Sequence, residues 1–133
     1  MGLYDLVPFR KLIDRGYPDY DSALEVSTAH TNIDHYRKFV SWAETDGLEV
    51  EQFRIGAEDQ LILKNNPEAY PDFRITNYAR DGKLWQDGKV VDLYEGKQPK
   101  ENGVSCCFLI QYGDFEFLTC GDAGGNSAVE VPL

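Results

Sequence analysis

The spacing of apolar residues constrains the fold of this chain more than any other feature of its sequence. After Leu48 the pattern changes to a period close to two over residues 50–55, 61–63 and 73–77, with apolar pairs at Phe53 and Ile55, Leu61 and Leu63, and Phe73 and Ile75. A period of two is typical of strands, whose side chains alternate between the two faces of a sheet. Prolines within residues 64–72 exclude that segment from a sheet, because proline cannot donate a hydrogen bond to a ladder. The pattern therefore predicts a strand-rich domain.

Glycine-containing turns punctuate these strands. The pairs Asp81-Gly82 and Asp87-Gly88 favour type I′ turns, which predicts a small meander around residues 84–91. A long apolar run follows at residues 104–111, and Gly113-Asp114 then separates it from a second strand. Glycine at the first central position suits a type II′ hairpin. A nearly continuous apolar strand also predicts burial on both faces.

The two-residue turn sets the register of this hairpin. Tyr112 is expected opposite Phe115, so Cys107 is expected opposite Cys120 and can form a cross-strand disulfide if oxidised. The chain has three cysteines, an odd number, and Cys106 adjoins Cys107. That set is no disulfide framework, and it indicates a reducing, cytoplasmic location. We therefore expect two buried thiols rather than a disulfide.

One helix is predicted, over residues 33–46, and a short strand at residues 10–16 ends at Gly16. The helix has one apolar stripe, which comprises Ile33, Tyr36, Phe39, Val40 and Ala43. Thr31 or Asn32 can cap its first turn, and Gly47 suits the position just after its last turn. The predicted fold class is therefore α/β, strand-rich, with one clear helix packed on a sheet.

Length and charge narrow the functional classes. A chain of 133 residues fits a single domain, 1–133. Its formal net charge of −10 repels phosphate backbones and anionic membranes, so we expect no nucleic-acid or membrane partner. The longest apolar run, residues 104–110, is far shorter than a bilayer span. The N-terminus shows no basic stretch followed by an apolar one, so no signal peptide is expected.

A longer pattern resembles a known superfamily. It begins with Asn102-Gly103-Val104-Ser105, continues through an apolar strand and Tyr112-Gly113-Asp114-Phe115, and ends with Thr119-Cys120-Gly121-Asp122. This pattern resembles a segment of the metallo-β-lactamase superfamily, in the branch related to the C-terminal hydrolase domain of competence-type DNA-uptake channels. Residues 12–18 and 53–56 are also similar to the region between that branch's motifs.

The resemblance implies a fold, a chemistry and a set of roles. The implied fold is an αββα sandwich, and the implied reaction is metal-assisted hydrolysis of an ester or phosphoester bond. In the superfamily, the aspartate of the final Gly-Asp bridges two metal ions, usually zinc, which assigns that role to Asp122. Asn102, Ser105 and Gly121 would set the strand and the loop beside the site.

The chain departs from the superfamily in its histidines. The superfamily has an H-x-H-x-D-H loop and two further histidines, whereas this chain has only His30 and His35. A catalytic zinc ion takes three protein ligands and keeps one open position, which Asp122 alone cannot provide. The chain is therefore expected to be an internal portion of an incomplete metallo-β-lactamase fold. It would be catalytically inactive and without zinc when alone.

The segment from His30 to His35 admits two interpretations. Its sequence, H-T-N-I-D-H, matches H-x-H-x-D-H except that Asn32 replaces the middle histidine. One interpretation is an ordinary helix N-terminus, in which Asp34 suits the dipole and His35 lies at the surface. The other is a weak one-metal site formed by His30, Asp34, His35 and Asp122.

Two functional hypotheses follow. The first is a partial or degenerate metal-dependent hydrolase, which would need a complementing chain or a homodimer. Exposed sheet edges in such a fragment would favour dimerisation. The second is a small acidic protein-binding module without metal or catalysis, which would bind a basic partner.

Overall fold

The computed structural model describes residues 7, 9–20, 31–96 and 104–121, with only the backbone described at residues 31 and 32. The chain divides into two compact units, Met1–Gln52 and Phe53–Leu133. The single domain expected from the chain length stays a prediction. Among the described residues, no helix combines the length and the apolar character needed to cross a membrane.

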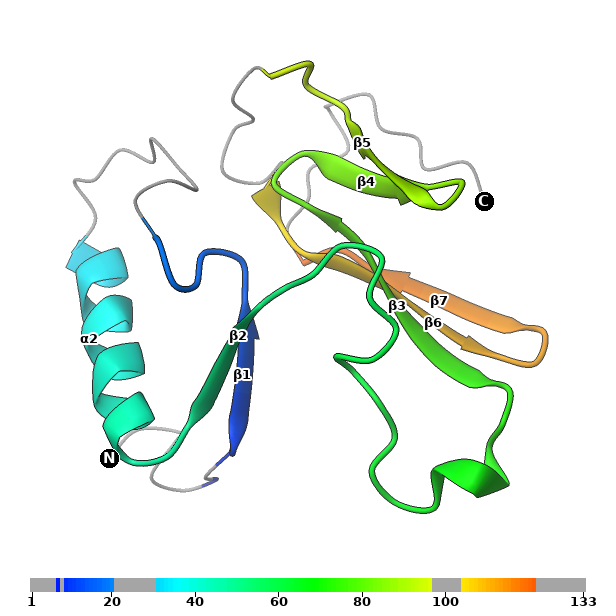
Figure 1. The fold of residues 1–133 in the computed structure, drawn as a ribbon, viewed down its shortest axis with the longest axis horizontal. Coiled ribbons are helices and arrows are strands. Elements are labelled where there is room, and N and C mark those ends of the chain that lie inside the picture. The colour runs from blue at the N-terminus through cyan, green and yellow to red at the C-terminus, as the bar shows by residue number, and fades with distance from the viewer. Residues whose placement is uncertain (1–6, 8, 21–30, 97–103, 122–133) are drawn as a thin grey trace. The chain divides into compact units, whose positions relative to one another are not determined.

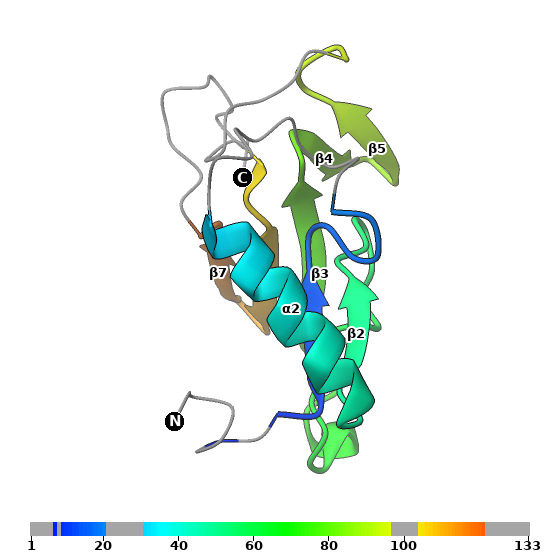
Figure 2. The same ribbon diagram turned by 90° about the vertical axis from the view of Figure 1, so that its left-hand side faces the viewer.

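The first unit is a strand–helix–strand arrangement. Strand β1 (Lys11–Asp14) and strand β2 (Glu49–Gln52) pair in parallel, and helix α2 (Thr31–Thr45) connects them. In Figure 2 the unit is turned so that α2 lies nearest the viewer. A parallel pair needs such a crossover, because a tight turn cannot return the chain in the same direction. Lys11 Nζ donates to Glu51 Oε1 at 2.6 Å across the pair. The predicted short strand is confirmed, although it ends at Asp14, two residues before Gly16, and the predicted helix is confirmed as well.

Helix α2 packs against β2 through its predicted stripe. Val40 and Ala43 are buried, and the other stripe residues are half-buried. The helix ends as expected at Gly47, which has a φ of 94°. The N–H of Leu48 donates to Ala43 O at 2.9 Å, and that of Gly47 donates to Glu44 O at 3.1 Å. These two bonds form a Schellman motif, which satisfies carbonyls that the helix leaves without partners.

The second unit contains a five-stranded antiparallel sheet in the order β5-β4-β3-β6-β7. Its strands are β3 (Phe73–Arg80), β4 (Lys83–Gln86), β5 (Lys89–Asp92), β6 (Cys107–Tyr112) and β7 (Phe115–Thr119). A short 3₁₀ helix at Pro67–Ala69 precedes β3. The predicted exclusion of residues 64–72 from the sheet is therefore confirmed.

The turns of the sheet follow the sequence prediction. In each Asp-Gly pair both residues have positive φ, 53° and 70° at Asp81-Gly82 and 50° and 75° at Asp87-Gly88. Positive φ at both central positions defines the type I′ turn. At the β6–β7 turn, Gly113 has a positive φ of 56° and Asp114 does not, as a type II′ turn requires of its two central residues. Tyr112 lies opposite Phe115, so the predicted hairpin register is confirmed.

The prediction of a strand at residues 61–63 is wrong. The predicted strand at residues 50–55 is also too long, because β2 ends at Gln52 and does not include Phe53 or Ile55. The edge of β3 that such a strand would need is already occupied at Asn77. Gly56 N donates to Asn77 O at 2.7 Å, and Asn77 N donates to Ala57 O at 2.9 Å. Residues 61–63 keep the alternation of a strand but have no paired backbone in the structure.

The core of the second unit lies at one end of the sheet. Its buried apolar residues are Phe53, Leu84, Val104 and Cys107, and its buried polar residues are Gln60, Thr76 and Asn77. The predicted burial of the β6 strand on both faces is wrong, because only Cys107 of that strand is buried. The described residues thus confirm the strand-rich α/β class with one α-helix.

Candidate functional site

Two residues that the resemblance places beside a metal site lie together in the structure. Ser105 precedes β6, and Gly121 follows β7. A Cβ atom built on Gly121 would lie 3.7 Å from Ser105 Cβ and 3.8 Å from Ser105 Oγ. Gly121 has a φ of 56°, a region that glycine enters without steric cost. The hairpin therefore brings Ser105 and Gly121, two residues of the 102–122 pattern, to one place.

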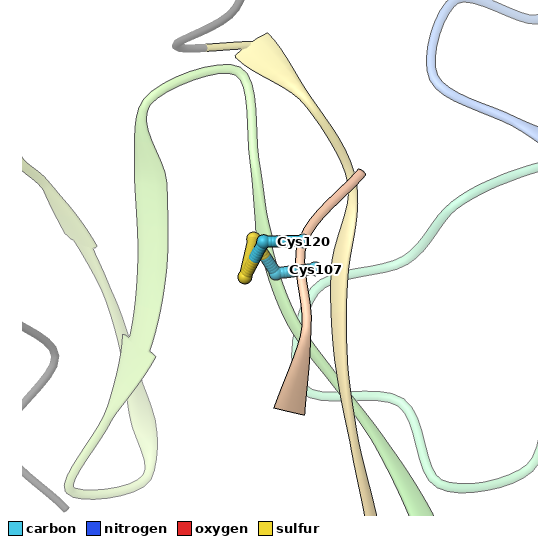
Figure 3. Close-up of a disulfide and its surroundings, with 2 residues drawn as sticks. All are labelled: Cys107 and Cys120. Atoms are coloured by element: carbon cyan, nitrogen blue, oxygen red, sulfur yellow. A yellow bond between two sulfur atoms is a disulfide. The ribbon is translucent and has the colours of Figure 1, made fainter. Parts of the chain in front are cut away.

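A disulfide joins the two strands next to this place (Figure 3). Cys107 and Cys120 are bonded, with their Cα atoms 4.0 Å apart. The expected pairing of these residues is confirmed, but the expectation of separate thiols is wrong. The expectation of thiols rested on the cysteine count, whereas the Tyr112–Phe115 register brings the two sulfur atoms within bonding reach. Cys106 is half-buried and is not part of this disulfide.

The remaining residues of the predicted site fall into two groups. Asn102, Asp122 and His30 lie outside the described residues. Asp34 and His35 are exposed on α2, in the first unit. Within residues 7, 9–20, 31–96 and 104–121, no group of three or more His, Cys, Asp or Glu side chains could hold a metal ion. The described residues therefore do not by themselves fit a zinc ion.

A cluster of hydrogen bonds around the carboxylate of Asp14, in the first unit, was not predicted. Asp14, at the end of β1, accepts four hydrogen bonds. Its Oδ1 atom accepts from the backbone N–H groups of Gly16 at 2.9 Å and Tyr17 at 2.8 Å. Its Oδ2 atom accepts from the hydroxyls of Tyr20 at 2.7 Å and Tyr36 at 2.5 Å. Asp14 thus links the loop after β1 to helix α2.

The environment of these tyrosines opposes their ionisation. Burial, followed by the hydrogen bond to Asp14, raises the pKa of Tyr20 and of Tyr36 above the ordinary value of 10.0. A phenolate beside a carboxylate would also be repelled. Both hydroxyls therefore stay protonated donors at neutral pH. In this protonated state both hydroxyls donate hydrogen bonds to Asp14.

A second polar cluster lies in the core of the second unit. Asn77 is fully buried, and its Nδ2 donates to Gln60 Oε1 at 2.7 Å. The same Gln60 oxygen accepts from Arg54 N at 2.8 Å. These bonds fasten residues 54–60 to β3. The apolar pattern of the sequence could not predict these hydrogen bonds, because Gln60 and Asn77 are polar and lie 17 positions apart.

A small hollow lies on the β3–β4 region. It has a volume of about 280 Å³ and is lined by Tyr78, Leu84, Trp85, Gln86 and Asp87. Asp87 is the one charged residue in that lining. Hydrolytic chemistry needs a nucleophile and a partner that moves its proton, so this lining does not form such a site.

Comparisons with known proteins add no relative. The chain matches no family model, no curated protein and no solved structure.

Proposed function

We propose that this chain is the strand-rich internal portion of a metallo-β-lactamase-like metal-dependent hydrolase. In this proposal, Asp122 is a metal ligand, and the histidine ligands come from outside the chain. The chain alone is inactive. The αββα sandwich is the complete fold to which the described sheet would contribute.

The observation that carries the proposal is the contact between Ser105 and Gly121. These residues are 16 positions apart in a pattern that resembles the superfamily, and the hairpin places them side by side. Asp122 is the residue that directly follows Gly121 in the sequence. A carboxylate just beyond the end of a strand occupies the kind of position where sheets hold functional groups.

In the proposed complete site, a bound metal would supply an activated water for hydrolysis. The contribution of this chain is narrower. Gly121 allows the backbone to turn beside Ser105, and the Cys107–Cys120 disulfide fixes the strand ends immediately before that turn. Asp122 would then offer its carboxylate from a rigid base.

Zinc titration followed by amide-resolved NMR tests the proposal. Because the other ligands come from outside the chain, we expect only weak binding, in which millimolar zinc shifts the Gly121 and Asp122 signals and Asp122→Asn abolishes those shifts. Asp114 offers a matched control, because it also follows a glycine and lies at the opposite end of the same hairpin. Asp114→Asn should leave the shifts at Gly121 unchanged.

Equal zinc shifts at Asp114 and Asp122 would indicate ordinary carboxylate binding and would count against the proposal. Hydrolysis of a simple phosphodiester is the second readout. We expect no zinc-dependent turnover by the chain alone. Turnover that is lost in Asp122→Asn would overturn the claim of inactivity.

A second candidate function is an acidic protein-binding module. It is favoured by a net charge of −10 together with exposed rings at Tyr112, Phe115 and Phe117. Such a module would bind a basic protein more weakly as salt concentration rises, because salt screens the attraction between the charges. Binding that is unaffected by salt would argue against this candidate.

A further inference from the structure

One face of the second unit's sheet is apolar across three neighbouring strands. The register places Phe73, Tyr112 and Phe115 in one row and Ile75, Ile110 and Phe117 in the next. Directly opposed residues point to the same face of a sheet. We call these six residues the aromatic face.

The aromatic face is open to solvent. Phe115, Phe117 and Tyr112 are 59%, 52% and 48% exposed, and the other members are half-buried. Tyr70, itself 47% exposed, extends the surface through a ring contact with Tyr112 at 6.2 Å. Contiguous apolar surface of this kind marks an interaction site, because its burial is favourable.

On the opposite face of the same strands, the row of Arg74, Gln111 and Glu116 is polar, and the next row consists of Thr76, Leu109 and Leu118. Arg74 Nη2 donates to Gln111 Oε1 at 2.9 Å, and Gln111 Nε2 donates to Glu116 Oε1 at 2.6 Å. These residues alternate with those of the aromatic face along each strand. Near the β6–β7 turn the sheet therefore has one polar and one apolar face, which is typical of a sheet that is solvated on one side and covered on the other.

We propose that the aromatic face binds the aromatic face of a second copy of this chain, so that two sheets pack face to face about a two-fold axis. Sheets pack in this way about 10 Å apart, with the side chains of the two inner faces interdigitated. The cover must be apolar, uncharged and of similar size. The aromatic face of a second copy meets these requirements, and a two-fold axis brings the same patch of both copies together.

The available area fits a weak dimer. A large aromatic side chain covers about 150–250 Å². Three rings that are half-exposed, with the remaining surface of their neighbours, offer roughly 400–500 Å² on each copy. The total of about 900 Å² lies at the low end for specific interfaces, where complexes are weak and transient. We therefore expect association in the range of tens to hundreds of micromolar.

Charge gives the proposed dimer a distinctive salt dependence. The aromatic face carries no charge, but Asp72 and Asp114 lie beside it and each whole chain is acidic. Two copies therefore repel each other at low ionic strength. Salt screens that repulsion, so association should strengthen as salt is added. A basic partner would show the opposite trend.

Sedimentation velocity over a concentration series, at low and moderate salt, tests the proposal with the full chain. We expect a monomer–dimer equilibrium. Phe117→Asp should raise the dissociation constant at least tenfold, because it places a charge within the apolar contact. Two matched controls should leave the constant within twofold. Glu116→Gln is adjacent to Phe117 but lies on the polar face, and Val90→Asp changes an exposed apolar residue of β5.

Intermolecular NOEs in a sample that mixes labelled and unlabelled chains provide a readout independent of any variant. We expect them among Tyr112, Phe115 and Phe117. A chain that stays monomeric at millimolar concentration would overturn the proposal. So would dimers that tolerate Phe117→Asp, or NOEs confined to backbone groups at the outer edge of β7, which would indicate edge-to-edge strand pairing. None of these results depends on zinc, so the inference can fail while the proposed function stands.

Discussion

Removing acceptors from Asp14 should uncouple helix α2 from the loop after β1. Asp14→Asn keeps an oxygen for the two backbone N–H groups, but its amide nitrogen can accept from neither the Tyr20 nor the Tyr36 hydroxyl. Hydrogen bonds to a charged group contribute about 1.5–3 kcal/mol each, and less where water competes. Asp14 is half-buried, so we expect this change to lower the free energy of unfolding of the first unit by about 2 kcal/mol.

Tyr36→Phe removes one donor of the same cluster without changing the ring. Its hydroxyl bonds to Asp14 Oδ2, while its ring packs edge-on against Tyr20 with centroids 5.9 Å apart. We expect a loss of about 1 kcal/mol, since one hydrogen bond is lost and the ring contact is kept. The double variant should lose less than the two single losses combined, by at least about 0.5 kcal/mol, because both changes remove the same bond.

Urea unfolding followed by circular dichroism at 222 nm measures these losses, since α2 is the only α-helix among the described residues. Tyr17→Phe is the control, because the hydroxyl of Tyr17 donates to the exposed Glu44 and not to Asp14. It should leave the unfolding midpoint nearly unchanged. Strictly additive losses for Asp14→Asn and Tyr36→Phe would refute the cluster as a coupled unit.

Three further predictions concern pH and the second unit. The pKa of Tyr20 and of Tyr36 is raised in the folded chain, so the unfolded chain loses these protons first as the pH rises. The contribution of these tyrosines to the free energy of unfolding is therefore fully present below pH 10 and is lost at higher pH. Tyrosinate absorbance should appear together with loss of helix, and titration of both groups in the folded chain would contradict this. Gly56→Ala should cost about 2 kcal/mol or more, because its Cβ would lie 2.7 Å from Trp85 at a φ of 79°, and tryptophan fluorescence during unfolding measures it. Reduction of the Cys107–Cys120 disulfide, which spans 13 positions, should destabilise the second unit by about 3 kcal/mol; an unchanged thermal midpoint in reductant would exclude that contribution.

Features that depend on a few neighbouring residues could be read from the sequence. Helix α2 ends at Gly47 because only a residue tolerant of positive φ completes the Schellman motif. The Asp-Gly pairs and Gly113 specify their turns for the same steric reason. The two-residue turn at Gly113 then determines, by counting, that Cys107 and Cys120 are opposed. Backbone sterics is short-ranged, so these predictions needed no knowledge of the rest of the fold.

Tertiary structure decided what depends on distant partners. Residues 61–63 alternate like a strand, but Gly56 and Ala57 occupy the edge of β3 that they would need. Asp14 became the acceptor of two phenols only because α2 returns past the end of β1. The apolar character of β6 predicted burial on both faces, yet the structure leaves its aromatic face exposed. An apolar strand is stabilised when other elements bury it, but the sequence of the strand does not determine whether such elements lie on both of its faces. The arrangement of the other elements determines that.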